Sequence, residues 1–97
     1  MFTGNTRVKD NTQPLVSIGI PTYNRFSGLK HALESIREQT YKNLDIIVSD
    51  NCSATDEIDS YMQKAVKDDS RIRYFRQSHN IGALRNFEFV LNKAKGK

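Results

Sequence analysis

The stretch VSIGIPTYN, residues 16–24, decides the fold that we expect for this chain. Its first half is apolar and rich in β-branched residues, which is typical of a strand buried on both faces, and a polar turn follows at once. In an open α/β sheet, ligands bind at the carboxyl ends of the strands. We therefore expect Thr22, Tyr23 and Asn24 at such an edge, with Asp50 at the end of the next strand.

The chain repeats one unit, a strand followed by an amphipathic helix, three times. Strands are predicted at 15–20, 44–48 and 72–75. The apolar residues that follow them at helical spacing are Leu29, Ala32, Leu33 and Ile36, then Ile58, Met62, Ala65 and Val66, then Leu84, Phe87, Leu91 and Ala94. This alternation implies parallel strands with right-handed crossovers. We expect a Rossmann-like, three-layer α/β half-domain, βαβαβα, with helices on both faces, strand order 3-2-1 and the third strand at an edge.

The helix starts carry capping signals. Ser27 is predicted to cap the first helix, and Ser53 or Thr55 the second. Asn80-Ile81-Gly82 is predicted to make the turn before the third helix, which Gly96 would stop.

Size and charge narrow the class of protein. The 97 residues fit a single domain, and no apolar run approaches the length of a membrane span. Residues 71–97 carry a net charge of +6, which suits an anion such as a nucleotide diphosphate, or acidic residues elsewhere in a longer protein. Nucleic acid is not expected, because the aromatic residues of this region fall in strand and helix patterns that would bury them: Tyr74, Phe75, Phe87 and Phe89.

Residues 1–13 lack the apolar core of a secretory signal and are predicted to be a flexible leader, with a cytoplasmic location for the protein. The single Cys52 forms no internal disulfide, and without Cys or His neighbours at ligand spacing it anchors no zinc site, so we interpret it as a small turn residue. His31 and His79 are interpreted as solvated or packing residues.

The chemistry at the strand ends favours one kind of ligand. Gly-x-Gly-x-x-Gly and Gly-x-x-x-x-Gly-Lys are both absent, which argues against NAD, FAD and P-loop sites. The Asp50 carboxylate is able to accept the N3–H of uracil or thymine, while Tyr23 offers a stacking face and Thr22 a hydroxyl. A pyrimidine nucleoside pocket is one interpretation. The alternative is that Asp50 and Asn51 only cap the turn before the second helix.

Five motifs in order resemble one family. They are residues 16–25, residues 29–41, Ile46-Ile47-Val48-Ser49-Asp50-Asn51, Asn80-x-Gly82 and Ala94-Lys95-Gly96. Together they closely resemble the N-terminal, nucleotide-binding part of inverting family 2 glycosyltransferases with the GT-A fold. The resemblance spans residues 14–97, which we interpret as the nucleotide-sugar-binding half of such a domain.

The resemblance implies a set of nucleotide-binding residues: Pro21, Thr22, Tyr23, Asn24, Asp50, Asn51, Asn80, Gly82 and Arg85. In the family, the acid after the second strand contacts the base, and Asn86 lies where a polar residue is common. Many members carry two adjacent acids there, and Ser49 replaces the first. The resemblance assigns this chain no catalytic residue and no metal ligand, because the chain ends before the family's Asp-x-Asp motif.

The implied activity of the full-length protein is transfer of a sugar, with inversion, from a UDP- or dTDP-sugar to a hydroxyl of a glycan or lipid-linked glycan. Mn²⁺ or Mg²⁺ is implied for that enzyme and not for these 97 residues alone, which we expect to bind nucleotide without catalysis. Cell-surface polysaccharide synthesis, in the cytoplasm or at the cytoplasmic face of the membrane, is the commonest setting.

Two other interpretations stay open. One is a non-catalytic assembly module that forms a homo-oligomer through an exposed sheet edge. The other, a flavodoxin-like or receiver-like domain, is disfavoured because acidic residues are missing at the end of the first strand.

Overall fold

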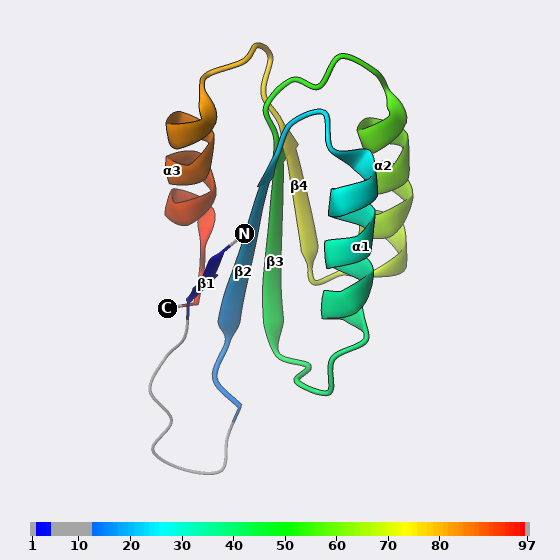
Figure 1. The fold of residues 1–97 in the computed structure, drawn as a ribbon. Helices are drawn as coiled ribbons and strands as arrows, with labels where there is room; N and C mark the ends of the chain where they lie inside the picture. Colours follow the sequence, from blue (N-terminus) through cyan, green and yellow to red (C-terminus); the bar gives the residue numbers. More distant parts are fainter. Residues whose placement is uncertain (1, 5–12, 97) are drawn as a thin grey trace.

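The computed structural model describes residues 2–4 and 13–96 and shows a sheet between two layers of helix (Figure 1). The elements in chain order are β1 (Phe2–Gly4), β2 (Val16–Thr22), α1 (Phe26–Arg37), β3 (Leu44–Asp50), α2 (Glu57–Asp68), β4 (Ile72–Arg76) and α3 (Ala83–Lys93). The strand order is β1-β2-β3-β4, with β2, β3 and β4 parallel. The predicted order of the three repeated strands is therefore confirmed, as are the edge position of β4 and the helices on both faces.

The strands β2 and β3 are longer than predicted at their carboxyl ends. They pair from Val16 with Leu44 up to Thr22 with Asp50. The sequence suggested that each strand ends two residues earlier, because Pro21 lacks an amide and Ser49 is polar. The amide of Val16 donates to the carbonyl of Asn43, toward β3. Backbone amides point alternately to the two sides of a strand, so the nitrogen of Pro21 points away from β3. The N–H that Pro21 lacks therefore removes no hydrogen bond between β2 and β3.

The strand β1 was not predicted, because residues 1–13 were expected to be a flexible leader. Residues 2–4 pair antiparallel with β2, Phe2 opposite Gly19 and Gly4 opposite Ser17. Three residues are too few for a periodic signal, whereas the outer edge of β2 offers unpaired backbone groups to any extended segment. Residues 1 and 5–12 of the expected leader lie outside the described residues, and the carbonyl of Gln13 accepts a hydrogen bond from the Asn43 side chain.

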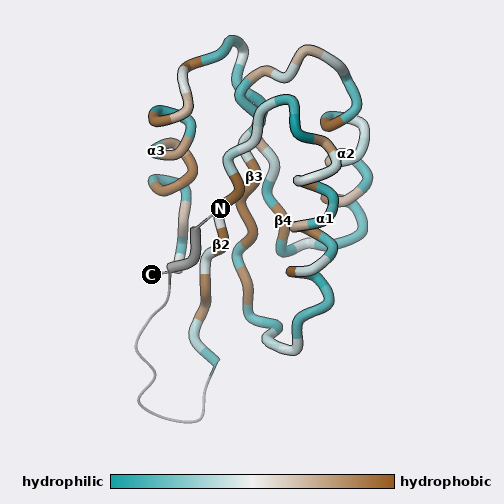
Figure 2. Tube along the Cα trace, in the orientation of Figure 1, coloured by the Kyte–Doolittle hydropathy of each residue, from teal (hydrophilic) through white to brown (hydrophobic). Residues whose placement is uncertain are grey.

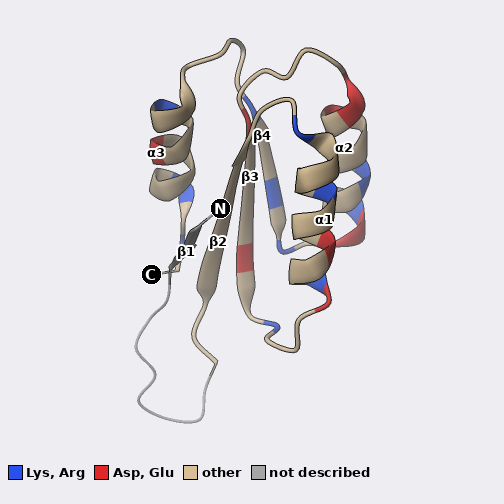
Figure 3. Ribbon diagram, viewed as in Figure 1, with Lys and Arg blue, Asp and Glu red and all other residues tan. Residues whose placement is uncertain are grey.

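The apolar core lies between the sheet and the helices α1 and α2. It joins side chains from β2, β3 and β4 to the inner stripes of both helices. Its fully buried members include Leu33, Ile46, Val48 and Met62, each at 0% exposure. Figure 2 shows hydrophobic residues along β2 and β3, and Figure 3 shows that most charged residues lie on helices and loops. Of the predicted stripes of these two helices, only Val66, 37% exposed, lies at the surface.

The helix α3 covers the opposite face and buries a different side from the predicted one. Leu84 is 71% exposed and Leu91 is 50% exposed, whereas Asn86 and Val90 are buried. The sheet face beneath α3 presents buried polar groups, among them Ser17 and Ser49. A polar sheet face selects a polar helix residue, and hydrophobic periodicity does not detect that match.

The predicted helix caps were wrong. The residue before α1 is Arg25, with Ser27 inside the first turn, and the residue before α2 is Asp56. Neither makes a capping hydrogen bond through its side chain. Ser53 donates instead to the Asp50 carboxylate.

The aromatic residues after residue 70 do not form a flat exposed platform. Tyr74, Phe75 and Phe89 are half-buried, and the rings of Phe75 and Phe89 meet edge to face at 5.3 Å. Lys93 places its ammonium group 5.4 Å from both ring centres. None of the helices in the described part of the chain combines the length and the hydropathy of a membrane-spanning segment.

Candidate functional site

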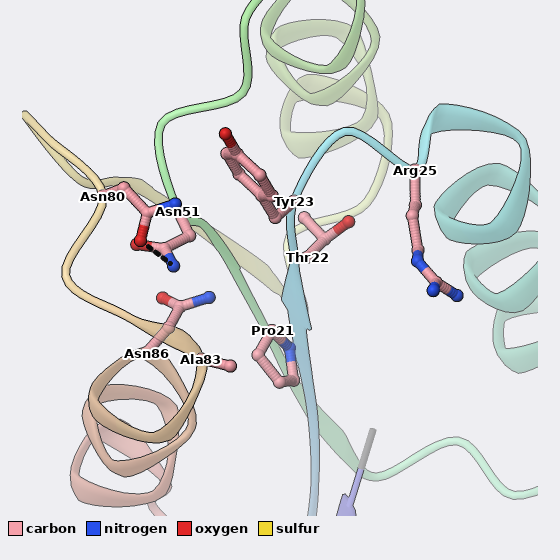
Figure 4. Close-up of a pocket in the computed structure, with 8 residues that line it drawn as sticks. All are labelled: Pro21, Thr22, Tyr23, Arg25, Asn51, Asn80, Ala83 and Asn86. Atoms are coloured by element: carbon pink, nitrogen blue, oxygen red, sulfur yellow. Dashed lines mark hydrogen bonds between the residues drawn. The ribbon is translucent and has the colours of Figure 1, made fainter.

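A hollow of about 440 Å³ opens at the carboxyl ends of β2 and β3, beside the start of α3 (Figure 4). Its walls come from the end of β2, from the loops that follow β2, β3 and β4, and from α3. The lining residues are Pro21, Thr22, Tyr23, Arg25, Asn51, Asn80, Ala83 and Asn86. This is the sheet edge at which parallel α/β folds bind ligands.

Asn51 fixes the shape of this hollow. The side-chain nitrogen of Asn51 donates to the side-chain oxygen of Asn80 at 3.0 Å, and the side-chain oxygen of Asn51 accepts from the backbone amide of Ile81 at 2.8 Å. The backbone amide of Asn51 donates to the carbonyl of Thr22 at 2.8 Å. Asn51 therefore ties the loop after β3 to the loop after β4 and to the end of β2.

The turn Asn80-Ile81-Gly82 forms as predicted. The side-chain oxygen of Asn80 accepts from the amide of Gly82 at 2.8 Å. Gly82 has φ of +89°, a left-handed conformation that side chains disfavour, and it directly precedes α3. The turn therefore sets where the first residues of α3 stand over the hollow.

Asp50 does not line the hollow. It is 1% exposed, and its carboxylate accepts from the amide of Ser53 at 3.2 Å and from the Ser53 hydroxyl. The Nε atom of Arg76 lies 3.9 Å from the same carboxylate. This geometry agrees with the alternative in which Asp50 braces the turn before α2. Contact with a base requires Asp50 to release one of these partners, and that contact stays a prediction.

Asn24 also braces a loop. Its side-chain oxygen accepts from the amide of Ala54, and its own amide donates to the Ser53 hydroxyl, both at 2.8 Å. Its φ of +52° is left-handed, which asparagine tolerates better than most residues. Arg85 is exposed and lies outside the lining.

The predicted binding residues thus fall into two groups. Those that line the hollow are Pro21, Thr22, Tyr23, Asn51 and Asn80, and those that do not are Asn24, Asp50, Gly82 and Arg85. Their roles in nucleotide binding stay predictions. In the second group, Asn24, Asp50 and Gly82 each stand directly beside a lining residue along the chain, whereas Arg85 is exposed.

Three lining residues were not assigned to the site from the sequence: Arg25, Ala83 and Asn86. Asn86 is 2% exposed and exchanges two hydrogen bonds with Ser49, whose hydroxyl donates at 2.7 Å and whose carbonyl accepts at 3.0 Å. Gln77 donates to the same hydroxyl at 3.1 Å. A signal was present in the sequence, because Ser49 and Asn86 both stand at positions where the family resemblance implies polar residues.

Arg25 is the one charged side chain among the residues that line the hollow. It follows the turn after β2, directly before α1. An arginine in the lining favours an anionic ligand. The Tyr23 ring, 43% exposed, adds an accessible aromatic face.

The described residues do not fit a Mn²⁺ or Mg²⁺ ion. Within residues 2–4 and 13–96, no three His, Cys, Asp or Glu side chains come together as a metal would need. Both ions prefer oxygen ligands, and the carboxylate closest in sequence to the hollow, that of Asp50, is buried with Ser53 and Arg76 as partners.

Comparison with known proteins gives relatives of one kind. At 40% identity over 85 residues, the chain matches a Campylobacter jejuni GalNAc(5)-diNAcBac-PP-undecaprenol beta-1,3-glucosyltransferase, across 87% of this chain and 27% of that protein. It is 35% identical over 81 residues to the putative colanic acid biosynthesis glycosyl transferase WcaA of Escherichia coli, across 80% of this chain and 28% of that protein. The chain therefore spans about a quarter of the length of these relatives.

A solved structure shares the fold. It is the mannosyltransferase PcManGT from Pyrobaculum calidifontis in complex with GDP-Man and Mn²⁺, with a TM-score of 0.73 and 22% identity. The match covers 88% of this chain and 26% of that one. The GT-A type of α/β architecture expected from the sequence is thereby confirmed.

The family model described as Glycosyl transferase family 2 matches residues 17–97. That match covers nearly all of the described sheet and helices, from β2 to the segment after α3. The chain belongs to glycosyltransferase family 2.

Proposed function

We propose that this chain is the donor-binding part of an inverting glycosyltransferase that moves a sugar from a nucleotide diphosphate to an acceptor hydroxyl. The observation that carries the proposal is the hollow at the carboxyl ends of β2 and β3, with an accessible tyrosine ring and one arginine in its lining. An aromatic face suits a base, and a guanidinium suits a diphosphate.

Six of the eight lining residues have a part in this proposal. The Tyr23 ring stacks on the base, and the Thr22 hydroxyl and the Asn51 and Asn80 amides face the nucleoside. Arg25 approaches the diphosphate. Asn86 holds the α3 wall of the hollow in place through Ser49. The general base that deprotonates the acceptor hydroxyl belongs to a part of a longer protein outside these 97 residues. The ligands of the metal ion belong there too.

The nucleotide is proposed to carry a pyrimidine, as in UDP or dTDP. Asp50 directly precedes the lining residue Asn51, and its carboxylate becomes available to the N3–H of a pyrimidine if the Ser53 hydroxyl turns away. The acceptor is proposed to be a glycan or lipid-linked glycan at the cytoplasmic face of a membrane. Support comes from the Campylobacter relative, whose name includes an undecaprenol-linked glycan.

A calorimetric titration of the chain with UDP, with and without Mn²⁺ and with AMP as the comparison, tests the proposal. We expect UDP to bind weakly, with the same affinity in the presence and absence of Mn²⁺, and AMP not to bind. Loss of the ring in Tyr23→Ala removes about 1–3 kcal/mol of stacking, and so weakens UDP binding by roughly five-fold or more. Equal binding of AMP and UDP, or no binding of either, argues against a pyrimidine nucleotide site.

Two arginines provide a matched pair of variants. Arg25→Ala is expected to weaken UDP binding, while Arg85→Ala, which removes an exposed side chain outside the lining, is expected to leave it unchanged. The reverse result would support the assignment of Arg85 from the sequence and would remove Arg25 from the site.

Asp50→Asn and Ser53→Ala together separate two roles of Asp50, contact with the base and bracing of the turn. Only a contact with the base predicts that Ser53→Ala strengthens UDP binding, because that change frees the Asp50 carboxylate from the Ser53 hydroxyl.

A further inference from the structure

Three asparagine side chains gather on one side of the hollow, with Pro21 and Thr22 across from them (Figure 4). They are Asn51, Asn80 and Asn86. The orientation of each carboxamide matters, because its oxygen only accepts hydrogen bonds and its nitrogen only donates them. Backbone groups, whose own role as donor or acceptor is fixed, decide all three orientations.

Backbone amides orient Asn80 and Asn51. The amide of Gly82 lies 2.8 Å from one side-chain atom of Asn80, and because an amide N–H donates, that atom is the oxygen. In the same way, the amide of Ile81 at 2.8 Å identifies the side-chain oxygen of Asn51. The side-chain nitrogen of Asn51 then donates to the Asn80 oxygen at 3.0 Å. The Asn80 oxygen therefore accepts two hydrogen bonds, one for each of its lone pairs.

The nitrogen of Asn80 has no acceptor in the described part of the chain, and the side chain is exposed, so both of its N–H groups are accessible to a ligand. The Ser49 carbonyl at 3.0 Å identifies the nitrogen of Asn86. Asn51 and Asn86 each donate one hydrogen bond and accept one, which leaves each with one N–H and one lone pair. The three carboxamides thus offer more free donors than free acceptors, and Asn80 offers donors alone.

An excess of donors favours a ligand that presents acceptors. Uracil and thymine carry ring carbonyl oxygens, whereas cytosine carries an amino group in place of one of them. A carboxamide nitrogen that faces this amino group leaves donors on both sides without an acceptor, which weakens binding. The free groups of the hollow therefore distinguish two bases of nearly the same size and shape.

We propose that Asn80 determines which base the hollow accepts, because its nitrogen donates to a carbonyl oxygen of uracil or thymine and disfavours cytosine. The inference rests on the proposed function, since it takes the ligand to be a pyrimidine nucleotide. It is separate from the contact proposed for Asp50, whose carboxylate addresses N3–H of the base. The turn before α3 is thereby part of base selection, because the Gly82 amide fixes which way the Asn80 carboxamide faces.

The variant Asn80→Asp changes this one group from a donor to an acceptor. One carboxylate oxygen keeps the contacts with Gly82 and Asn51, and the other replaces the nitrogen. Calorimetric titrations with UDP and CDP give the ratio of their affinities in both proteins. We expect UDP to bind about ten times more tightly than CDP to the parent, and the ratio to fall to about one or below in the variant. Asp50 is the same in both proteins, so it does not account for such a change.

The matched control is Ser78→Asp. It adds the same charge at an exposed position of the same loop, outside the lining of the hollow. Repulsion of the diphosphate weakens the binding of UDP and CDP alike, because the two nucleotides carry the same phosphates. We therefore expect their affinity ratio to stay as it is in the parent.

The side-chain amide signal of Asn80 in a heteronuclear NMR spectrum supplies a second readout, on the parent protein itself. We expect UDP to shift this signal. The proposal is overturned, and the proposed function is not, if UDP binds and the ratio is the same in the parent and in Asn80→Asp. Should that variant not fold, a signal that UDP leaves unmoved overturns it equally. If neither UDP nor CDP binds to the parent, the proposal and the proposed function fail together.

Discussion

The two faces of the sheet are built on different principles. The face under α1 and α2 is apolar, with Ile46, Val48 and Leu33 all at 0% exposure. The face under α3 also excludes water, yet it buries Ser17, Ser49, Asp45 and Asn86 together with Ile47 and Val90. Every one of those polar side chains has a hydrogen-bond partner across the interface or along the sheet.

This difference separates stability from positioning. An apolar face gains free energy from burial without fixing orientation closely, whereas hydrogen bonds are directional. The polar face is the one that borders the hollow and holds the chain near Gly96. We infer that α1 and α2 supply most of the folding free energy, while α3 sets the geometry of the site.

The largest expected effect lies on the apolar face. Leu33→Ala removes a fully buried side chain and should lower the free energy of unfolding by about 3 kcal/mol through lost burial and a cavity. Urea unfolding followed by circular dichroism measures it. Leu84→Ala on α3, at a residue 71% exposed, should change stability by less than about 0.5 kcal/mol. Equal costs would contradict the comparison of the two faces.

On the polar face, Asp45→Ala leaves the Arg73 guanidinium, the Ser17 hydroxyl and the Lys95 backbone amide without their shared acceptor. Breaking a fully buried pair costs about 3–5 kcal/mol, and because the Arg73 side chain is 27% exposed we expect about 2 kcal/mol. The matched control is Asp56→Ala. Its carboxylate lies 3.8 Å from Arg76 but its side chain is 92% exposed, so a change below about 0.5 kcal/mol is expected. A similar loss in both variants would mean that burial does not distinguish these pairs.

Asn86→Ala tests whether the polar match holds α3. It deprives Ser49 of a hydrogen-bond acceptor for its hydroxyl and a donor for its carbonyl, which should cost about 1–2 kcal/mol. Asn92→Ala, at an exposed position on the same helix, is the control and should be near neutral. If both variants unfold at the same urea concentration as the parent, the Ser49–Asn86 contact contributes nothing to docking of α3.

Two glycines should respond to alanine with opposite signs. Gly96→Ala forces the backbone away from Leu15 and should destabilise by about 1 kcal/mol, because the Cβ atom would meet a carbonyl oxygen. Gly28→Ala, inside α1 with no atom within 4 Å of the new Cβ, should stabilise by about 0.5–1 kcal/mol. Thermal melting of both variants decides this, and a stabilising Gly96→Ala would show that the close approach does not persist in solution.

The smallest effect is expected at the rim of the apolar face. The side-chain hydrogen bond from Arg71 holds the pKa of Asp69 below its usual value of 3.8, and Arg37 adds a contact at 3.4 Å. Because folding lowers the pKa of Asp69, the contact stabilises the folded state at pH values above the usual pKa of an aspartate. This stabilisation is lost as the pH falls through the lowered pKa of the folded state. Asp69→Asn should cost less than about 1 kcal/mol at neutral pH and nothing in strong acid. A cost that does not change with pH would contradict an ionic origin.

The sequence revealed the apolar face almost completely. The spacing of Leu29, Leu33 and Ile36 and of Ile58, Met62 and Ala65 predicted which sides of α1 and α2 are buried, and all six are. For α3, hydrophobic periodicity predicted the wrong buried side. It assigned Leu84 and Leu91 to the buried side although both are exposed, and it did not detect that Asn86 is buried. Periodicity reports hydrophobic burial, so it fails where burial is satisfied by hydrogen bonds.

The site shows the same division. Pro21, Thr22, Tyr23, Asn51 and Asn80 were identified at strand ends and in a turn, and these residues do line one hollow. Arg25 was missed because nothing in its local pattern distinguishes it from a solvated arginine. The burial of Asp50 behind Ser53 depends on how the turn after β3 closes, which residue spacing does not specify.

By itself, the sequence determined the alternation of strands and helices, the parallel order of β2, β3 and β4, the family, and the sheet edge where the hollow lies. These follow from local periodicity and from rules of chain connection. Tertiary structure alone decided which side of α3 is buried, that β1 covers the edge of β2, and that Asp45 holds the chain at Gly96. Those features depend on directional contacts between residues as far apart as Ser17 and Gly96, and no local pattern records such contacts.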